Sequence, residues 1–192
     1  DNLVINGTGS LTVTNAFTNS ANTTISAATL VLNGTSTMAS LTQSGGQILG
    51  SGTLTVTGPA TISFGGHSGP GTTVVQGATT ISSSGLRLDG GRTFRNEGTV
   101  TQTGAVNLNL IAVGSAEPGN GTVLNAAGGT WTASGASSSI LASNQGTGDT
   151  GAGATFTNAG TFLRTGTSQT IVSVLFNNTG TLNVQEGTLS LT

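Results

Sequence analysis

The residues best suited to catalysis in this chain are His67, the single histidine, and the adjacent Ser68. Hydrolases with a nucleophile elbow place the serine in a Gly-x-Ser-x-Gly turn, where a histidine base can reach its hydroxyl. The pattern would need glycine at position 70, where this chain has Pro70. The glycine-rich segment GGHSGPG is also a poor mount for catalytic groups, which need rigid support. We therefore expect His67 to be a solvated loop residue, and we predict no catalytic residues.

A second candidate is the segment Gly146–Gly151, which contains the Asp-Thr-Gly triplet of aspartic proteases and also matches Gly-x-Gly-x-x-Gly. In aspartic proteases apolar strands flank the triplet, whereas glycine and glutamine flank it here. The phosphate-binding pattern has meaning only between a strand and a helix, and no helix signal follows. We interpret the segment as a glycine-rich loop and predict no bound cofactor.

The charged residues are too dispersed for a recognisable acid–base or metal site. No two carboxylates lie within seven residues of each other in the sequence, and no tandem calcium-binding repeats occur. Stacked coils could still bring Asp89 or Glu97 beside other acids, as in solenoid polysaccharide lyases and hydrolases, so an enzyme stays a third alternative. Three arginines bracket two of the carboxylates, which predicts a local ion network, with a site for sulfated or carboxylated glycans as the alternative. The carboxylates are Asp1, Asp89, Glu97, Glu117, Asp149 and Glu186, and the three arginines are Arg87, Arg92 and Arg95.

Composition excludes several classes of partner. Only 5% of the 192 residues are charged, the net charge is −2, and there is no lysine. Such a chain lacks the basic surface that binds nucleic acid or anionic membranes. No apolar stretch approaches the roughly 18–20 residues of a membrane-spanning helix. The absence of cysteine excludes disulfides and thiolate chemistry.

The elements that must position any site are strands. Segments such as GTLTVTG, residues 52–58, alternate apolar and polar residues strictly, and no window shows helical periodicity. The separators between these segments are Gly, Asn-Gly, Asp-Gly and Ser-Gly, which favour turns. The sequence therefore predicts an all-β protein.

One short motif recurs along the chain: a large apolar residue, asparagine two places later, then a glycine followed by threonine. We interpret it as strand, corner, strand, with the asparagine in a left-handed or hydrogen-bonded bend. Its apolar positions are separated by 30, 32 and 20 residues. The copies are Phe94, Asn96 and Gly98; a looser copy at Leu124; Phe156, Asn158 and Gly160; and Phe176, Asn178 and Gly180. Phe17-Thr18-Asn19 is a degenerate first copy.

This spacing predicts a single elongated parallel β-solenoid over residues 1–192, with irregular coils of about 20–32 residues. The apolar residues Phe94, Leu124, Phe156 and Phe176 would form one interior column, and the asparagines an amide ladder. Trp131 would also be a core residue. A β-sandwich is the alternative fold, because it explains alternation but not the repeated motif.

Residues 52–104 and 155–192 resemble repeat regions of very large bacterial surface and extracellular proteins, of the adhesin and filamentous haemagglutinin-like kind. The resemblance is one of repeat style and implies a parallel β-solenoid at the cell surface. It carries over no catalytic residues. We therefore expect a structural, non-enzymatic extracellular protein, with an adhesin stalk or a segment binding cell-surface glycans as the alternative.

Pairs of threonines separated by one residue, such as Thr53/Thr55 and Thr99/Thr101, suggest ice binding as a further alternative. Such binding needs a pair in nearly every coil on one face. The uneven spacing of the pairs argues against it, and threonine is in any case a favourable outward residue in strands.

The two ends of the chain read as strands without a polar cap, which solenoids normally need. We expect these strands to pair between copies, so that the partner is the same chain in a head-to-tail filament. The predicted assembly residues are Leu3, Val4, Ile5, Leu189 and Leu191.

Overall fold

The computed structural model, which describes residues 1–108, 120–136, 138–142 and 151–192, is a parallel β-solenoid. Every pairing between described strands is parallel and joins one coil to the next. The predicted fold is therefore confirmed. The β-sandwich alternative is wrong, because a sandwich is built from antiparallel sheets.

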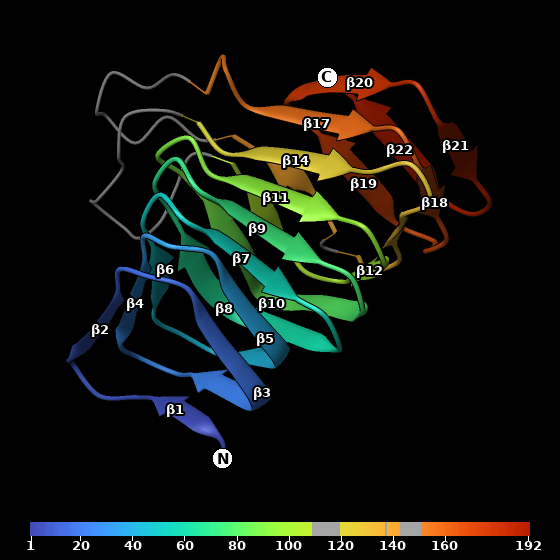
Figure 1. Cartoon of the computed structure of the whole chain (residues 1–192). Coiled ribbons are helices and arrows are strands. Elements are labelled where there is room, and N and C mark those ends of the chain that lie inside the picture. Colours follow the sequence, from blue (N-terminus) through green and yellow to red (C-terminus); the bar gives the residue numbers. More distant parts are fainter. Residues whose placement is uncertain (109–119, 137, 143–150) are drawn as a thin grey trace.

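Eight coils stack into an elongated body with the two termini at opposite ends (Figure 1). Residues paired from coil to coil on one face show the coil lengths, which are 19, 18, 19, 21, 29, 33 and 20 residues. These paired residues are Phe17, Ser36, Leu54, Thr73, Phe94, Val123, Phe156 and Phe176.

Each coil has three faces, and four long strands bend to serve two of them. The long strands are β3 (Phe17–Ile25) and β5 (Ser36–Gln43), which run from face 1 to face 2, and β8 (Ala60–His67) and β10 (Ala78–Leu88), which run from face 2 to face 3. Face 1 continues through β7 (Thr53–Val56), β9 (Thr72–Val75), β11 (Thr93–Asn96), β14 (Thr122–Asn125), β17 (Thr155–Asn158) and β20 (Leu175–Asn178).

The other two faces are built from shorter strands. Face 2 adds β1 (Leu3–Ile5), β12 (Thr99–Gln102), β15 (Thr130–Ala133), β18 (Thr161–Arg164) and β21 (Thr181–Val184). Face 3 adds β2 (Ser10–Val13), β4 (Thr29–Leu32), β6 (Gln47–Leu49), β13 (Val106–Asn107), β16 (Ile140–Leu141), β19 (Gln169–Val172) and β22 (Thr188–Leu191).

The interior column on face 1 contains Val123 and not Leu124. Val123 pairs with Phe94 and Phe156 and is buried, whereas Leu124 pairs with Arg95 and Thr157 on the outer surface. The prediction for Leu124 is wrong because strand alternation runs through Val-Leu-Asn, so the residue two places before the asparagine faces inward. Phe17 belongs to the same column, as its degenerate motif predicted.

Aromatic rings fill the C-terminal half of the interior. Phe156 lies edge-on to Trp131 and Phe162, with ring centroids 5.1 and 5.5 Å apart, and stacks on Phe176 at 5.4 Å. Trp131 is buried, as expected, and its indole N–H donates to Oε1 of Gln102 at 2.8 Å. The ring pairs add specific geometry to a large buried apolar area.

The expected asparagine ladder is present at the corner between faces 1 and 2. The Nδ2 of Asn96 donates to Oδ1 of Asn125 at 2.8 Å, Asn125 donates to Asn158 at 2.7 Å, and Asn158 donates to Asn178 at 2.7 Å. Among the described residues only Ser83 is a non-glycine residue with positive φ, so of the two expected bends the left-handed one is wrong. The hydrogen-bonded one is confirmed at Asn96, whose Oδ1 accepts from the N–H of Gly98 at 3.0 Å. The asparagine is required for its amide and not for its backbone.

The glycine of the motif is needed for close approach between coils. A Cβ on Gly98, Gly160 or Gly180 would collide with backbone carbonyls of the preceding coil. None of the three has a positive φ. The motif therefore encodes a corner that stacks directly on the corner of the previous coil.

We predict that Phe156→Ala lowers the free energy of unfolding by about 3–5 kcal/mol, because it removes a buried ring at the centre of the aromatic cluster. Leu124→Ala is the matched control, since Leu124 faces outward, and we expect a loss below about 1 kcal/mol. Denaturant unfolding of both variants is the measurement. Equal losses would contradict the register described above.

Candidate functional site: the uncovered end coils

The two end coils present strand edges that no described strand covers. At the N-terminal end, β1 pairs only with β3, and β2 only with β4. At the C-terminal end, β20, β21 and β22 pair only with β17, β18 and β19. Their outward N–H and C=O groups form templates for a further parallel strand on each face.

Inward-facing apolar residues of these coils are exposed because nothing stacks on them. Leu182, Val184 and Leu191 are 37%, 47% and 49% exposed, and Leu11 at the other end is 37% exposed. The residue paired with each of them one coil further in is 0% exposed; these are Phe162, Arg164, Val172 and Leu30. One more coil at each end would bury the same positions.

The sequence-predicted assembly residues lie at these two ends but differ in exposure. Val4 and Leu191 are exposed, Leu3 and Leu189 pack partly against the core, and Ile5 is already buried. Sequence reasoning missed Leu182 and Val184 on β21. Their signal was present, because they are the last members of inward columns that run through face 2.

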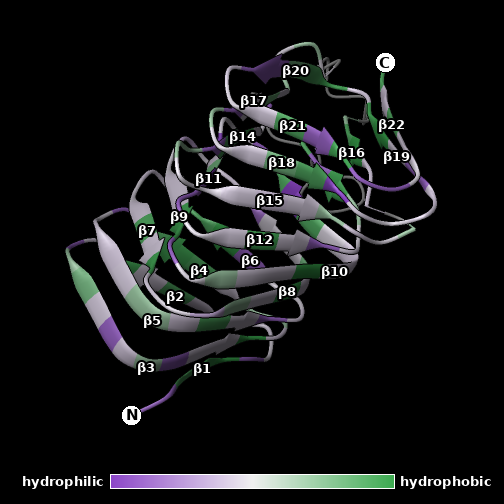
Figure 2. Cartoon of the chain, turned by 90° about the vertical axis from the view of Figure 1, so that its right-hand side faces the viewer, coloured by the Kyte–Doolittle hydropathy of each residue, from purple (hydrophilic) through white to green (hydrophobic). Residues whose placement is uncertain are grey.

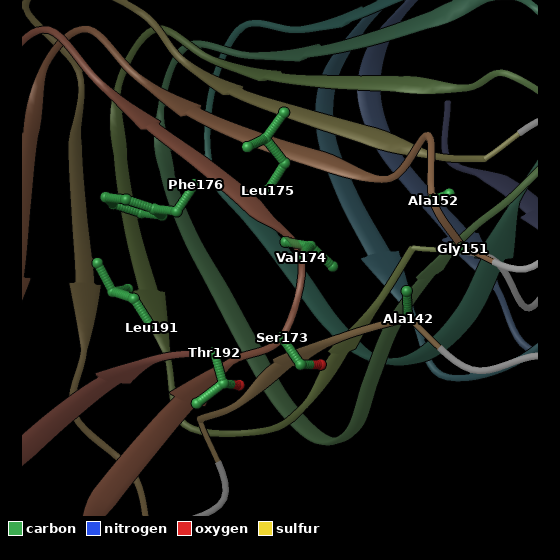
Figure 3. Close-up of a pocket in the computed structure, with 9 residues that line it drawn as sticks. All are labelled: Ala142, Gly151, Ala152, Ser173, Val174, Leu175, Phe176, Leu191 and Thr192. Atoms are coloured by element: carbon green, nitrogen blue, oxygen red, sulfur yellow. The ribbon is translucent and has the colours of Figure 1, made fainter.

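A pocket of about 480 Å³ opens beside the C-terminal coil (Figure 3). Val174, Leu175, Phe176 and Leu191 contribute most of its large apolar side chains. Among the described residues of its lining there is no charged side chain. The pocket thus lies beside the end coil, and its described lining mixes apolar side chains with the hydroxyls of Ser173 and Thr192.

His67 lies in the interior, so the prediction of a solvated loop histidine is wrong. It is the last residue of β8, in register between Ile48 and Leu88, and it is fully buried. The glycines before it do not make a loop. Gly65 leaves space for the side-chain amide of Gln43 within the strand stack.

A directional chain of hydrogen bonds holds His67 in its neutral form. Arg92 donates from Nη2 to Oγ1 of Thr73 at 3.0 Å, and Oγ1 of Thr73 lies 3.1 Å from Nδ1 of His67. Nε2 of His67 lies 2.8 Å from Oε1 of Gln43, which can only accept. Burial, and secondly the charge of Arg92, lower the pKa of His67 to about 3.

Of the expected local ion network, the described residues show the pair of Arg95 with Glu97. Arg92 is buried, donates to the carbonyl of Gly50 at 3.1 Å, and has its pKa lowered by burial to about 10. Arg95 pairs with Glu97 at 2.6 Å, and hydrogen bonds from Gln76 and then Arg95 hold the pKa of Glu97 below its usual range. The guanidinium of Arg87 stacks over Phe64 at 4.5 Å.

Burial therefore removes Arg92 from any outer glycan site, and Asp89 is buried as well, with its Oδ1 accepting from the N–H of Gly90 at 2.9 Å. Glu117, Asp149 and the glycine-rich loop candidate up to residue 150 lie outside the described residues. In the described part of the chain, no three side chains of metal-binding type gather. No helix there is long and apolar enough to cross a membrane.

Six consecutive coils carry an outward column of threonines on face 2, whose strands β12, β15 and β18 cross the view in Figure 2. Thr24, Thr42, Thr61, Thr80, Thr101 and Thr132 pair in register over six consecutive coils. Thr-x-Thr pairs, however, lie on face 2 in only two of these coils, at Thr99/Thr101 and Thr130/Thr132, so the requirement of a pair in nearly every coil is not met. The two longest coils take up their extra residues between faces 3 and 1, in the connections from β13 to β14 and from β16 to β17, so face 2 keeps its register.

We predict that the free energy of unfolding decreases as the pH is lowered from about 6.5 to 4.5, because of His67. Its pKa is about 3 when folded, against 6.5 in the unfolded chain. Above pH 6.5 His67 is unprotonated in both the folded and the unfolded state. Below pH 6.5 only the unfolded state binds the proton, which lowers the free energy of unfolding by up to roughly 1.4 kcal/mol per pH unit. Urea unfolding of the wild type and of His67→Gln over this range is the measurement. Equal slopes for the two proteins would contradict the prediction.

Comparison with known proteins identifies no relative of this chain. No protein-family model matches the chain, and no curated protein or solved structure is significantly similar to it.

Proposed function

We propose that this protein is a structural, non-catalytic component of an extracellular bacterial fibre, in which copies of the chain stack end to end by parallel strand pairing. The observation that carries the proposal is the exposure of inward-facing apolar residues on both end coils. The low charge and the resemblance in repeat style to bacterial surface proteins support the extracellular location.

Two properties of the end coils favour a coil of the same kind as their partner. The free edges of β20, β21 and β22 can each accept a parallel strand, as every other coil of the stack does. The two end coils also match in side-chain type on face 2. The inward columns of this face begin with the apolar residues Leu3 and Ile5 and end with the apolar residues Leu182 and Val184. Contacts between unlike ends do not close, so they generate filaments.

We predict that the unaltered chain forms filaments in negatively stained electron micrographs and that Leu189→Pro abolishes them. The N–H groups of Thr188 and Thr192 bond to the coil beneath, so the N–H of Leu189 points to the free edge. Proline there removes an outward donor while β22 remains paired with β19.

Thr157→Lys is the matched control, since Thr157 faces outward from the middle of face 1, and it should still polymerise. A monomeric unaltered chain at high concentration would overturn the proposal. In that case the end coils would be covered by further coils of a longer protein, as in an adhesin stalk.

A second candidate function, ice binding, is favoured by the threonine column of face 2. Neighbouring strands are about 4.8 Å apart, so the column repeats hydroxyl and methyl groups at that interval. The neighbouring outward positions add Thr99, Thr130, Thr161 and Thr181 in a second column. None of the outward residues on the strands of face 2 is charged. A flat, regular and uncharged array of this kind suits a lattice of ordered water.

We predict that, if face 2 binds ice, the protein shows thermal hysteresis that the double variant Thr61→Lys, Thr101→Lys loses. Two long charged side chains would hold the flat face away from the ice surface. The double variant Thr55→Lys, Thr157→Lys places the same charges on face 1 and should retain the effect. Absence of hysteresis in the unaltered chain would exclude this candidate.

A further inference from the structure

We propose that Asn33 is an acceptor for an N-linked sugar, in which its Nδ2 forms the bond to the sugar and a sugar diphosphate is the donor. Asn33 opens the tripeptide Asn33-Gly34-Thr35, which joins β4 on face 3 to β5 on face 1 (Figure 1). Asparagine with threonine two places later is the acceptor pattern of N-glycosylation, which requires a surface position. The proposal does not depend on the end-to-end assembly.

The acceptor pattern occurs five times in the chain, at Asn6, Asn22, Asn33, Asn120 and Asn177. Asn6 and Asn177 lie in the two end coils, and the other three copies lie between them. Asn33 and Asn120 begin the same tripeptide, Asn-Gly-Thr, on the same edge of the solenoid, between a strand of face 3 and a strand of face 1. Their surroundings differ, and this difference determines which of the two can be modified.

The backbone of the turn at Asn33 is fixed by hydrogen bonds to the preceding coil. The N–H of Asn33 donates to the carbonyl of Val13 at 2.9 Å, and the carbonyl of Thr35 accepts from the N–H of Phe17 at 3.1 Å. Gly34 packs so closely on the preceding coil that a Cβ would lie 2.3 Å from a backbone oxygen. The turn therefore holds its two flanking side chains in fixed positions on the outside of the coil.

Both groups that an acceptor must present are accessible at this turn. Asn33 and Thr35 are exposed, although a coil lies on each side of them. The amide oxygen of Asn33 faces the next coil, where the N–H of Ser51 donates to it at 3.4 Å. No hydrogen bond among the described residues uses Nδ2 of Asn33, so none must be broken before this nitrogen reacts.

Asn120 offers the same tripeptide in a closed position. Its Oδ1 is buried, and its Nδ2 lies against the next coil, where a Cβ on Gly153 would approach it to 2.9 Å. Gly121 is buried, and the hydroxyl of Thr122 lies 3.0 Å from that of Thr93. An enzyme that must enclose the carboxamide of the acceptor cannot do so here.

Asn22 is also engaged, because it lies within β3 and not in a turn. Its Nδ2 donates to Oγ1 of Thr24 at 3.0 Å, and its Oδ1 accepts from the hydroxyl of Ser40 at 2.9 Å. Thr23, the middle residue of this copy, is buried. Of the three copies between the end coils, all of which the structure describes, Asn33 is therefore the one that presents an unbonded amide nitrogen on an exposed turn.

The proposed step is a substitution at the anomeric carbon of the donor, a hexose joined to a nucleoside diphosphate or to a lipid diphosphate. Nδ2 of Asn33 forms the new C–N bond and gives up one proton to a base of the transferring enzyme. The bond from the anomeric carbon to the diphosphate oxygen breaks, and the diphosphate leaves with its electron pair. No group is oxidised or reduced.

Enzymatic transfer onto the folded protein tests the site. Two N-glycosyltransferases are used, one that takes glucose from UDP-glucose and one that takes an oligosaccharide from a lipid diphosphate. Each is first shown to modify free peptides of residues 29–39 and 116–126, which contain the two Asn-Gly-Thr copies. Mass spectrometry of the digested protein then gives the modified fraction of each asparagine. We expect a sugar on Asn33 and none on Asn120, and the enzyme that transfers it identifies the source of the donor.

Substitutions in the turn separate recognition of the tripeptide from damage to the fold. Asn33→Gln and Thr35→Ala should each abolish modification of this turn, whereas Thr35→Ser should keep it, because serine retains the hydroxyl. Asn120→Gln is the matched control and should leave the modified fraction of Asn33 unchanged. Circular dichroism of each variant before the transfer reaction shows whether the strands are intact.

Absence of sugar on Asn33 of the folded protein with both enzymes would overturn the proposal, because both enzymes accept the same sequence as a free peptide. Equal modification of Asn33 and Asn120 would overturn it as well, since exposure would then not select the site.

Discussion

The whole structure depends on the parallel pairing of each coil with the next, which places coils about 4.8 Å apart. At this separation a residue in one coil meets the equivalent residue of its neighbours. Asn96, Asn125 and Asn158 can therefore exchange amide hydrogen bonds, and Phe156 can stack on Phe176. The same separation excludes a Cβ at the corner glycines. The inward residues of the two end coils have a neighbouring coil on one side only.

The interior tolerates polar residues where the coils above and below supply partners. Gln102 accepts from Trp131 and donates to the carbonyls of Gly104 and Ser139, and it satisfies an indole that an apolar neighbour could not. Arg164 donates to the carbonyl of Ala133 at 2.8 Å. Such groups are stable in a solenoid because the stack holds donors and acceptors in register. They also give individual coils an identity, since each polar residue fits only beside its own partners.

Local patterns in the sequence were sufficient to predict the fold, because the same short motif recurs along the chain as the coils do. Phe94, Phe156 and Phe176 were placed correctly by the asparagine two residues later. Leu124 was misplaced because it is larger than its neighbour Val123, which is the true member of the column. Side-chain size did not indicate which of the two residues faces inward. The position of His67 could not be predicted, since glycines normally indicate turns, and only the packing of Gln43 from another coil explains them. The apolar columns that end uncovered at the two end coils likewise could be identified only once the strand register was known.

Variation in coil length has a consequence for how such a protein can change over time. The corner between faces 1 and 2 keeps nearly constant length, since the paired columns are five to eight residues apart in every coil, whereas the longest connections run from face 3 to face 1. Loop closure becomes only slowly more costly as a loop lengthens. Insertions at that one edge therefore leave the hydrogen-bonded faces intact. The length of this edge can therefore vary while the stacked faces keep their geometry.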